Sequence, residues 1–242
     1  MPEVRPGDDL AALIVEAAEA SVAALRGGEV LVVAQKVVSK AEGRLVRLGG
    51  VEPDDRAHEL AERTGKDPRL VQLILDESDE VLRVGREVLI VRTHHGFVCA
   101  NAGIDQSNVP GDDIACLLPT DPDGSARALR SGIRRRLGVA PAVLVSDSFG
   151  RAWRLGQLDV AIGCAGMGPL HDRRGERDAQ GRELSATVDA VADAAAAAAS
   201  LVRHKDGGEG VVVVHGLERY VIANDGPGAA AIVRPEAEDL FR

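Results

Sequence analysis

The first third of the chain passes from a helix-like to a strand-like spacing of its apolar residues. Asp8-Asp9 precede apolar positions that recur at steps of three and four residues over 10–18, which is typical of an amphipathic helix. Gly27-Gly28 ends that pattern. The unbroken apolar run 30–33 then predicts a buried strand, and the polar residues 39–44 predict a loop after it.

The central part of the chain predicts two helices, a hairpin and a further helix. Residues 56–82 read as two short acidic helices. Residues 88–91 and 97–100 read as strands joined by a surface turn at His94-His95-Gly96. The turn residues 121–124 then start a basic amphipathic helix that ends near Gly138.

In the last third of the chain, two apolar strands flank a helix that is rich in alanine. We expect a short strand at 143–145 that leads into a loop at 146–151, a helix over 187–202, and a strand at 211–214. So many alanines favour close helix packing, which suits a subunit interface. Strands mixed irregularly with helices predict an α+β fold with mixed sheets and packed helices. We expect a single domain over residues 1–242, with its best internal boundary near 110–123.

Composition excludes several classes of function. The 242 residues include 38 Asp and Glu against 29 Lys and Arg, a net charge of −9, which disfavours binding to a nucleic-acid backbone. Aromatic residues make up only 2%, so a base-stacking surface is not expected. No apolar run is long enough to cross a membrane and no secretory signal is visible, so we expect a cytoplasmic protein. The three cysteines, Cys99, Cys116 and Cys164, are far apart in the sequence and form neither a disulfide framework nor a metal-binding pair. This usage fits the reducing cytoplasm.

Polar clusters follow three of the predicted strands, although no standard phosphate loop, dinucleotide fingerprint, zinc motif or nucleophile elbow is present. Gln35-Lys36 and the segment 39–44 place basic groups beside small residues, which suits an anionic ligand such as a polyphosphate. Residues 101–108 surround Asp105 with amides and a hydroxyl, the oxygen donors that Mg²⁺ or Mn²⁺ prefers. Residues 146–151 combine Asp147, two serines and Arg151, so they suit both a cation and a phosphate.

The first two clusters also have plainer explanations. A solvated charged loop accounts for the first, and ordinary turn residues account for the second. Taken together, two Asp-bearing strand ends and several basic loops suggest a metal–polyphosphate site for phosphoryl transfer or ligation.

The order of these clusters resembles the coenzyme F420-0:L-glutamate ligase (F420-0 gamma-glutamyl ligase) family over nearly the whole chain. The similarity is carried by uncommon strings in a shared order rather than by one motif. These strings are Pro6-Gly7-Asp8-Asp9-Leu10, Val38-Ser39-Lys40-Ala41-Glu42-Gly43-Arg44, Asn101-Ala102-Gly103-Ile104-Asp105, Ser107-Asn108-Val109, Asp121-Pro122-Asp123, Ser146-Asp147-Ser148-Phe149-Gly150-Arg151, Gly175-Glu176-Arg177-Asp178, Gly181-Arg182-Glu183-Leu184 and Val191-Ala192-Asp193.

The resemblance implies a dimeric, GTP-dependent ligase that joins L-glutamate to coenzyme F420-0 through an acyl phosphate, with gamma linkage on extension. It implies two Mg²⁺ or Mn²⁺ ions per site and stimulation by K⁺. By this resemblance Asp105, Asp147 and Ser148 bind metal, and Asp105, Asp147 and Arg151 are catalytic. The residues implied to contact GTP are Gln35, Lys36, Lys40, Asn108 and Lys205.

The same resemblance leaves the acceptor open. The alternative is a related ligase that joins an amino acid to a different carboxylic acid by the same acyl-phosphate chemistry, in secondary metabolism. Some relatives carry a flavin-binding reductase-like domain after the ligase region, and we expect none here.

Overall fold

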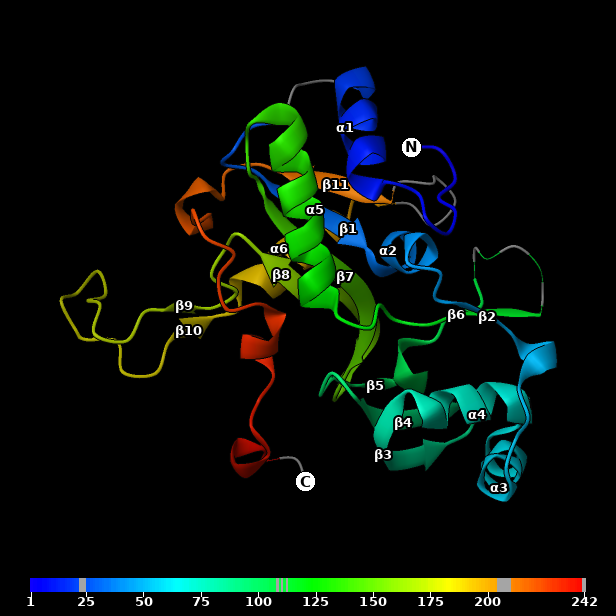
Figure 1. The fold of residues 1–242 in the computed structure, drawn as a ribbon. Helices are drawn as coiled ribbons and strands as arrows, with labels where there is room; N and C mark the ends of the chain where they lie inside the picture. Colours follow the sequence, from blue (N-terminus) through cyan, green and yellow to red (C-terminus); the bar gives the residue numbers. More distant parts are fainter. Residues whose placement is uncertain (22–24, 108, 110, 112, 204–209, 241–242) are drawn as a thin grey trace.

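The computed structural model describes all residues except 22–24, 108, 110, 112, 204–209 and 241–242. A mixed four-stranded sheet forms the centre of the larger lobe (Figure 1). One inner pair of strands is parallel, and both outer pairs are antiparallel. In spatial order the strands are β11 (Val211–Val214), β1 (Val30–Ala34), β7 (Ala142–Arg151) and β8 (Arg154–Ala165).

The central sheet is covered by helices on both faces. Alternate β1 side chains pack with helices α1 (Leu10–Ser21) and α5 (Pro122–Leu137) on one face. The remaining β1 side chains pack with α6 (Val191–Ser200) on the other face. Because both faces are buried, the strand shows an unbroken apolar run instead of alternation. The strand predicted at 30–33 is therefore confirmed, and so is the α+β class.

A smaller lobe is inserted between β1 and α5 and has its own hydrophobic core (Figure 1). Its two helices pack on a three-stranded antiparallel sheet in the order β3-β4-β5, and a separate two-stranded ladder lies where the chain enters and leaves the lobe. The helices are α3 (Asp55–Thr64) and α4 (Pro68–Asp76), the sheet strands are β3 (Ser78–Gly85), β4 (Val88–Thr93) and β5 (Val98–Ala100), and the ladder is β2 (Leu45–Arg47) with β6 (Ile114–Cys116).

The ends of three helices follow from local capping residues. The side chains of Asp54, Asp67 and Asp121 accept hydrogen bonds from backbone N–H groups in the first turns of α3, α4 and α5. Such caps satisfy donors that have no partner inside the helix. Gly65 and Gly138 end α3 and α5 in the left-handed conformation that glycine adopts without strain. The predicted start and end of the helix at 121–138 are confirmed.

The prediction that 56–82 holds only helices is wrong after residue 77. Residues 78–85 form β3, which pairs with β4 across a turn containing Glu87 at φ 62°. The pairing partner lies beyond the predicted segment, so helical spacing within it could not reveal the strand. The hairpin of β4 with β5 and the surface turn at 94–96 are confirmed.

Residues 146–151 were expected to form a loop and instead continue β7. Their pairing with β8 extends to Arg151, and a tight turn with Trp153 at φ 58° closes the hairpin. Because the side chains at these positions are polar, the spacing of apolar residues does not predict a strand here. The strand forms through backbone hydrogen bonds to β8. Asp147 therefore lies within a long strand and not in a loop.

Two further segments differ from their predicted conformation. Residues 35–41 form a short helix, α2 (Gln35–Ala41), where charged loop residues were expected from 39 onward. Val188 belongs to a projecting two-stranded arm, so the alanine-rich helix is shorter than predicted. The arm is β9 (His171–Asp172) with β10 (Val188–Asp189), and the 3-10 helices are η1 (Leu48–Gly50), η2 (Asn101–Gly103), η3 (Glu218–Tyr220), η4 (Ala229–Ile232) and η5 (Glu236–Glu238).

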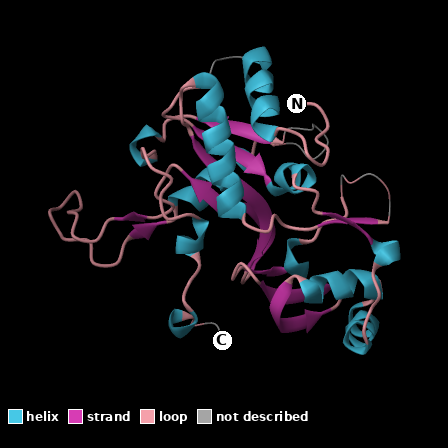
Figure 2. Cartoon of the chain, in the orientation of Figure 1, coloured by secondary structure: helices cyan, strands magenta, loops and turns pink. Residues whose placement is uncertain are grey.

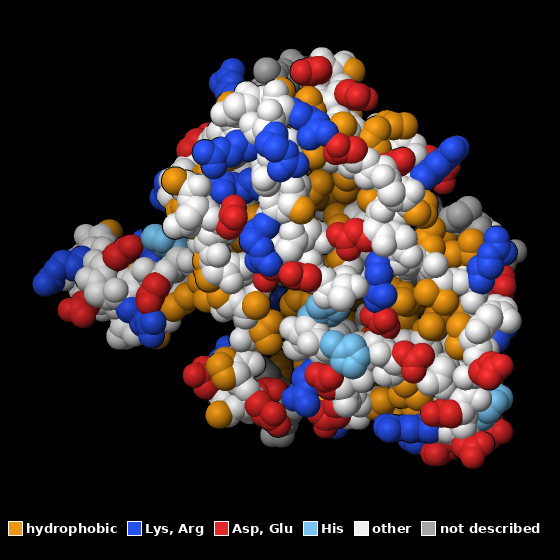
Figure 3. Space-filling model, in the orientation of Figure 1, with side chains coloured by type: hydrophobic (Ala, Val, Ile, Leu, Met, Phe, Trp, Pro, Cys, Tyr) orange, Lys and Arg blue, Asp and Glu red, His pale blue; other side chains and the backbone are white. Residues whose placement is uncertain are grey.

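Figure 2 shows the helices of the larger lobe against its strands and the projecting arm at one side. Basic side chains gather over α5 in Figure 3, where Arg127, Arg134 and Arg135 are exposed. No helix within the described residues is long and apolar enough to span a membrane.

The single domain over 1–242, with its boundary near 110–123, stays a prediction.

Candidate functional site

A cavity of about 1090 Å³ opens between the edge of the central sheet and the segment that follows β5. It is large enough for a ligand of nucleotide size. Its walls come from the N-terminal residues 1–4, α2, β7, β8 and the residues that flank 204–209. All three predicted polar clusters contribute to it through Gln35, Lys36, Lys40, Asp105, Asp147 and Ser148.

Asp105 is held at the cavity by an unusual backbone and by a lysine. It follows η2, in which Asn101, Ala102 and Gly103 all have positive φ, a conformation that is unfavourable for the two residues with a Cβ. Its backbone forms a bridge with Cys116. The tertiary structure thus over-determines this segment and fixes the carboxylate in place.

The charge of Asp105 is balanced by Lys36. Lys36 Nζ lies 2.7 Å from Asp105 Oδ2 and donates to Ser107 Oγ at 2.7 Å. Burial raises the pKa of the Asp105 carboxyl, but hydrogen bonds from Lys36 and Ser107 outweigh burial, so the pKa is lowered overall. Asp105 is therefore an anion at neutral pH, beside a lysine that reaches the same wall.

Asp147 is in the opposite electrostatic situation. It lies on β7 opposite Val160 and is half-buried. Burial raises the pKa of its carboxyl to about 7, and the charges of Asp105 and Asp159 act in the same direction. The Ser148 amide and Lys36 act against this rise. A carboxyl with this pKa indicates a site that lacks positive charge, which a bound cation would supply.

The donor set fits a hard divalent cation that is shared with a ligand. No group of three or more His, Cys, Asp and Glu side chains that could hold a metal occurs within the described part of the chain. Mg²⁺ commonly takes one or two protein carboxylates and completes its shell with water and phosphate oxygens. Asp105, Asp147 and the Ser148 hydroxyl supply oxygen donors of this type to one cavity.

Two residues of α2 present unused polar groups at the cavity. Gln35 is only 2% exposed, and its Oε1 accepts a hydrogen bond from Ser39. Its Nε2 has no hydrogen-bond partner among the described residues, which leaves a donor for a ligand. Lys40 is half-buried and lines the cavity, and no described carboxylate lies within 4.0 Å of its ammonium nitrogen. An ammonium group in that setting suits a phosphate.

One predicted residue, Arg151, is not brought to the site. Arg151 lies at the exposed end of the β7–β8 hairpin, where its Nη2 donates to the carbonyl of Leu155 at 2.9 Å, and it is not among the cavity residues. Its catalytic role gains no support from this geometry. Asn108 and Lys205 lie outside the described residues.

Sequence reasoning missed a buried ion pair in the cavity wall. Asp159 on β8 is 6% exposed, and its Oδ2 lies 2.7 Å from Arg203 Nη1. Asp159 Oδ1 accepts a hydrogen bond from Ser148 Oγ at 2.6 Å. In the sequence, Asp159 is visible only as an acid directly before the apolar residues of β8. Its role as half of an ion pair becomes apparent only when the fold places Arg203 beside it.

The three cysteines are not suited to take part in the chemistry of the cavity. All three are buried and free. Burial raises the pKa of the thiols of Cys99 and Cys164 to about 12 and that of Cys116 to about 11. Neutral thiols are poor nucleophiles and poor metal ligands. Cys99 lines the cavity as a small apolar group.

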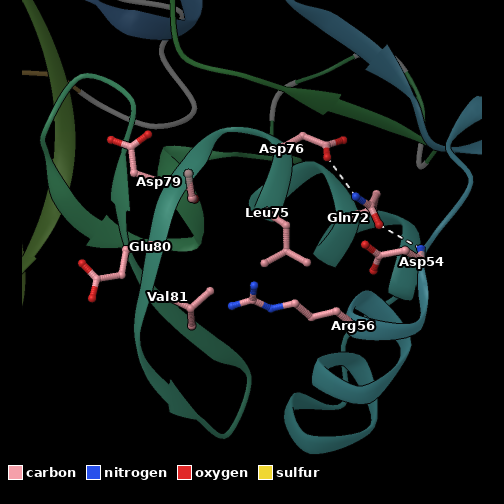
Figure 4. Close-up of a pocket in the computed structure, with 9 residues that line it drawn as sticks. Asp54, Arg56, Gln72, Leu75, Asp76, Asp79, Glu80 and Val81 are labelled. Carbon is pink, nitrogen blue, oxygen red and sulfur yellow. Dashed lines mark hydrogen bonds between the residues drawn. The ribbon is translucent and has the colours of Figure 1, made fainter.

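A second, smaller cavity of about 200 Å³ lies between α3, α4 and β3 (Figure 4). Gln72 bridges its rim, accepting from the backbone N–H of Asp54 and donating to Asp76 Oδ1. The other acids that line it are Asp79 and Glu80. None of the predicted site residues reaches this cavity, so the larger cavity is the candidate site.

The fold defines an α+β protein with mixed sheets and a polar cavity beside the central sheet, and sequence comparisons define its family. Residues 1–216 match the family described as F420-0:Gamma-glutamyl ligase. The chain is 47% identical to the coenzyme F420:L-glutamate ligase of Methanothermobacter thermautotrophicus, over 100% of this chain and 96% of that protein. It is 48% identical to the protein of the same name from Methanopyrus kandleri, over 99% and 94% of the two chains. The chain therefore belongs to the F420-0:gamma-glutamyl ligase family.

Proposed function

We propose that this protein is a GTP-dependent amide ligase of coenzyme F420 biosynthesis that attaches L-glutamate to coenzyme F420-0, with gamma linkage on extension. The observation that carries the proposal is one cavity that joins two carboxylates, suited to a cation, with Lys36 and Lys40, suited to phosphates. Its relatives, which match over nearly their full length, are named for the same reaction. The proposed compartment is the cytoplasm.

The proposed chemistry has two steps. A carboxylate oxygen of the acceptor attacks the γ-phosphorus of GTP, the bond to the β-phosphate oxygen breaks, and an acyl phosphate and GDP result. The glutamate amine then attacks the acyl carbon, phosphate leaves, and the nitrogen loses a proton. Two steps are needed because a free carboxylate is a poor electrophile, whereas phosphate is a good leaving group.

The residues of the cavity have different proposed roles. Lys36 and Lys40 neutralise phosphate oxygens, and Gln35 donates a hydrogen bond to the nucleotide. Asp105, Asp147 and Ser148 hold Mg²⁺ or Mn²⁺, which when bound screens phosphate charge and aligns in-line attack. The two lysines and the two aspartates are half-buried, which strengthens their electrostatic contacts with the ligand relative to bulk water.

A product assay tests the whole proposal. Purified protein with F420-0, L-glutamate, GTP and Mg²⁺ or Mn²⁺ should yield a product heavier by one glutamyl residue, together with GDP and phosphate, and K⁺ should increase the rate. Parallel reactions replace GTP by ATP and F420-0 by other carboxylic acids. Activity only with another acid would support the alternative acceptor, and no product with any nucleotide would refute the ligase proposal.

Nucleotide binding should also appear as a gain in thermal stability. GDP with Mn²⁺ at 100 times its Kd should stabilise the fold by about 2.7 kcal/mol, because the ligand binds only the folded state. At roughly 2–4 °C per kcal/mol this corresponds to a rise in Tm of about 5–10 °C. Lys40→Met should reduce the rise, whereas Lys66→Met, at a half-buried lysine outside the cavity, should leave it unchanged. An unchanged Tm at saturating GDP with either metal would contradict this site.

We also propose that the protein is a homodimer, although the basis differs from the one first expected. Four alanines of α6 pack on its own sheet and only Ala194 and Ala198 are exposed, so most of this helix is not available to a partner. Exposed apolar side chains lie instead at the β7–β8 tip, where Trp153 is 81% and Leu155 98% exposed. Such groups mark an interaction surface. Light scattering at micromolar concentration should give a dimer mass, and Leu155→Ser should weaken the dimer; a monomer mass for the unaltered protein would refute this proposal.

A further inference from the structure

Asp159 and Arg203 form a buried ion pair that no step of the proposed chemistry uses. Their side chains are only 8% and 14% exposed, and the Nη1–Oδ2 distance is 2.7 Å. Both line the candidate cavity, yet the pair belongs to its wall. A buried ion pair is weak support for stability, since apolar residues of similar volume often serve as well. Its charges therefore call for another explanation.

The first observation is the direction of the Ser148 hydroxyl. Ser148 Oγ donates to Asp159 Oδ1 at 2.6 Å, and the two residues are direct partners across the β7–β8 ladder. A serine hydroxyl has one proton and two lone pairs. With its proton committed to Asp159, the oxygen can only accept from, or coordinate to, what lies in the cavity. Without Asp159 the hydroxyl is free to rotate.

The second observation is how Arg203 fixes Asp159. Arg203 Nη2 donates to the carbonyl of Val32 on β1 at 3.1 Å, and its Nη1 also lies 3.1 Å from Ser146 Oγ. Arg203 thus joins the acid on β8 to the backbone of β1 across the intervening strand β7. Its Nε is buried without a hydrogen-bond partner among the described residues. Three hydrogen bonds from its two terminal nitrogens fix the orientation of the guanidinium.

We propose that the Asp159–Arg203 pair is a positioning unit that directs the Ser148 oxygen toward the cation and so sets the affinity of the site for Mn²⁺ and Mg²⁺. This inference rests on the proposed function. Outer partners of metal ligands commonly change metal affinity by about 10–100-fold when they are removed. The structure assigns Asp159 and Arg203 that role by hydrogen-bond geometry.

The test is direct Mn²⁺ binding, measured by the electron paramagnetic resonance signal of free Mn²⁺ in the presence of GDP. Asp159→Asn keeps the shape of the side chain but has an oxygen at only one of the two positions, Oδ1 and Oδ2, that accept from Ser148 and from Arg203. Arg203→Lys keeps the charge and loses the fork that reaches Asp159 and Val32 together. Each variant should bind Mn²⁺ about tenfold more weakly or worse. Turnover should recover at high Mn²⁺, since the defect is in affinity.

A second arginine–aspartate pair elsewhere in the fold, in which the arginine is buried and the aspartate half-exposed, provides the control. Arg130 is buried and pairs with Asp225 at 2.8 Å, and its guanidinium also donates to backbone carbonyls, yet neither residue lines the cavity. Arg130→Lys and Asp225→Asn should lower Tm and leave Mn²⁺ affinity unchanged. This contrast separates a loss of positioning from a general loss of stability.

The outcomes separate this inference from the proposed function. If the unaltered protein binds neither Mn²⁺ nor GDP, the proposed function fails and this inference with it. If it binds both, and folded Asp159→Asn and Arg203→Lys variants keep its Mn²⁺ affinity, only the positioning role is overturned. Should Asp159→Asn not fold, Arg203→Lys decides by the same measurement.

Discussion

Asp147→Asn is expected to lower turnover by at least about a hundredfold, the scale of a lost electrostatic contact in a transition state. Asn keeps the shape and one oxygen of Asp147 and removes the charge that holds a divalent cation. The same change should stabilise the metal-free protein at pH 8. Activity and stability are thus expected to move in opposite directions, which is the signature of a functional carboxylate.

The gain in stability follows from the pKa of Asp147. Burial raises this pKa from 3.8 to about 7, so the folded state binds the proton more tightly than the unfolded chain. The unaltered protein therefore loses stability as pH rises from about 4 to about 7, and the loss is complete above pH 7. At about 1.4 kcal/mol per pKa unit, the variant should be more stable by about 2–4 kcal/mol at pH 8 and equal near pH 3.

Turnover and Tm measured on one preparation test this expectation. Asp193→Asn is the control, because burial also raises the pKa of that half-buried carboxyl, which lies outside the cavity. It should change stability and leave turnover alone. A folded Asp147→Asn variant with unaltered turnover would end the metal assignment. Lower stability by about 1 kcal/mol with normal turnover would instead assign Asp147 a purely structural role in β7.

Gly163→Ala is expected to destabilise the fold by about 3 kcal/mol or more. A Cβ on Gly163 of β8 would lie 2.2 Å from the backbone oxygen of Pro122, in the first turn of α5. That turn cannot retreat easily, because Asp123 Oδ1 accepts hydrogen bonds from the N–H groups of Cys164 and Ala229. The methyl group therefore meets backbone that is anchored on both sides.

Thermal unfolding checks this second expectation. The loss corresponds to a fall in Tm of roughly 6–12 °C for a chain of this length. Gly50→Ala is the matched control, since a Cβ there meets nothing within 4 Å and the residue has no positive φ. A Gly163→Ala variant that melts together with the Gly50→Ala variant would show that α5 moves aside at little cost.

Elements with local signals were predictable from the chain alone. The helix at 122–137 has a proline in its first turn, an Asp cap directly before it and a left-handed glycine directly after it. The strand β1 is an apolar run bounded by polar residues. In both cases the residues that specify the element are its own residues and their immediate neighbours, so reading along the chain is sufficient.

Elements that depend on a distant partner were not predictable. Residues 146–151 are polar and become a strand only because β8 pairs with them. Residues 78–85 become a strand because β4 lies beside them. Hydrogen bonds between strands join residues whose proximity no local spacing encodes, so apolar periodicity describes such segments poorly.

The candidate site shows the same division. Residue types and their order along the chain already indicated phosphate and cation chemistry at Lys36, Asp105 and Asp147. Only the folded structure places Lys36 beside Asp105 and buries Asp147 so that its pKa is raised. Only the folded structure, likewise, brings Asp159 into hydrogen-bond contact with Ser148 and with Arg203. Charge interactions depend on distance and burial, and both quantities arise only when the sheet brings strands from opposite ends of the chain together.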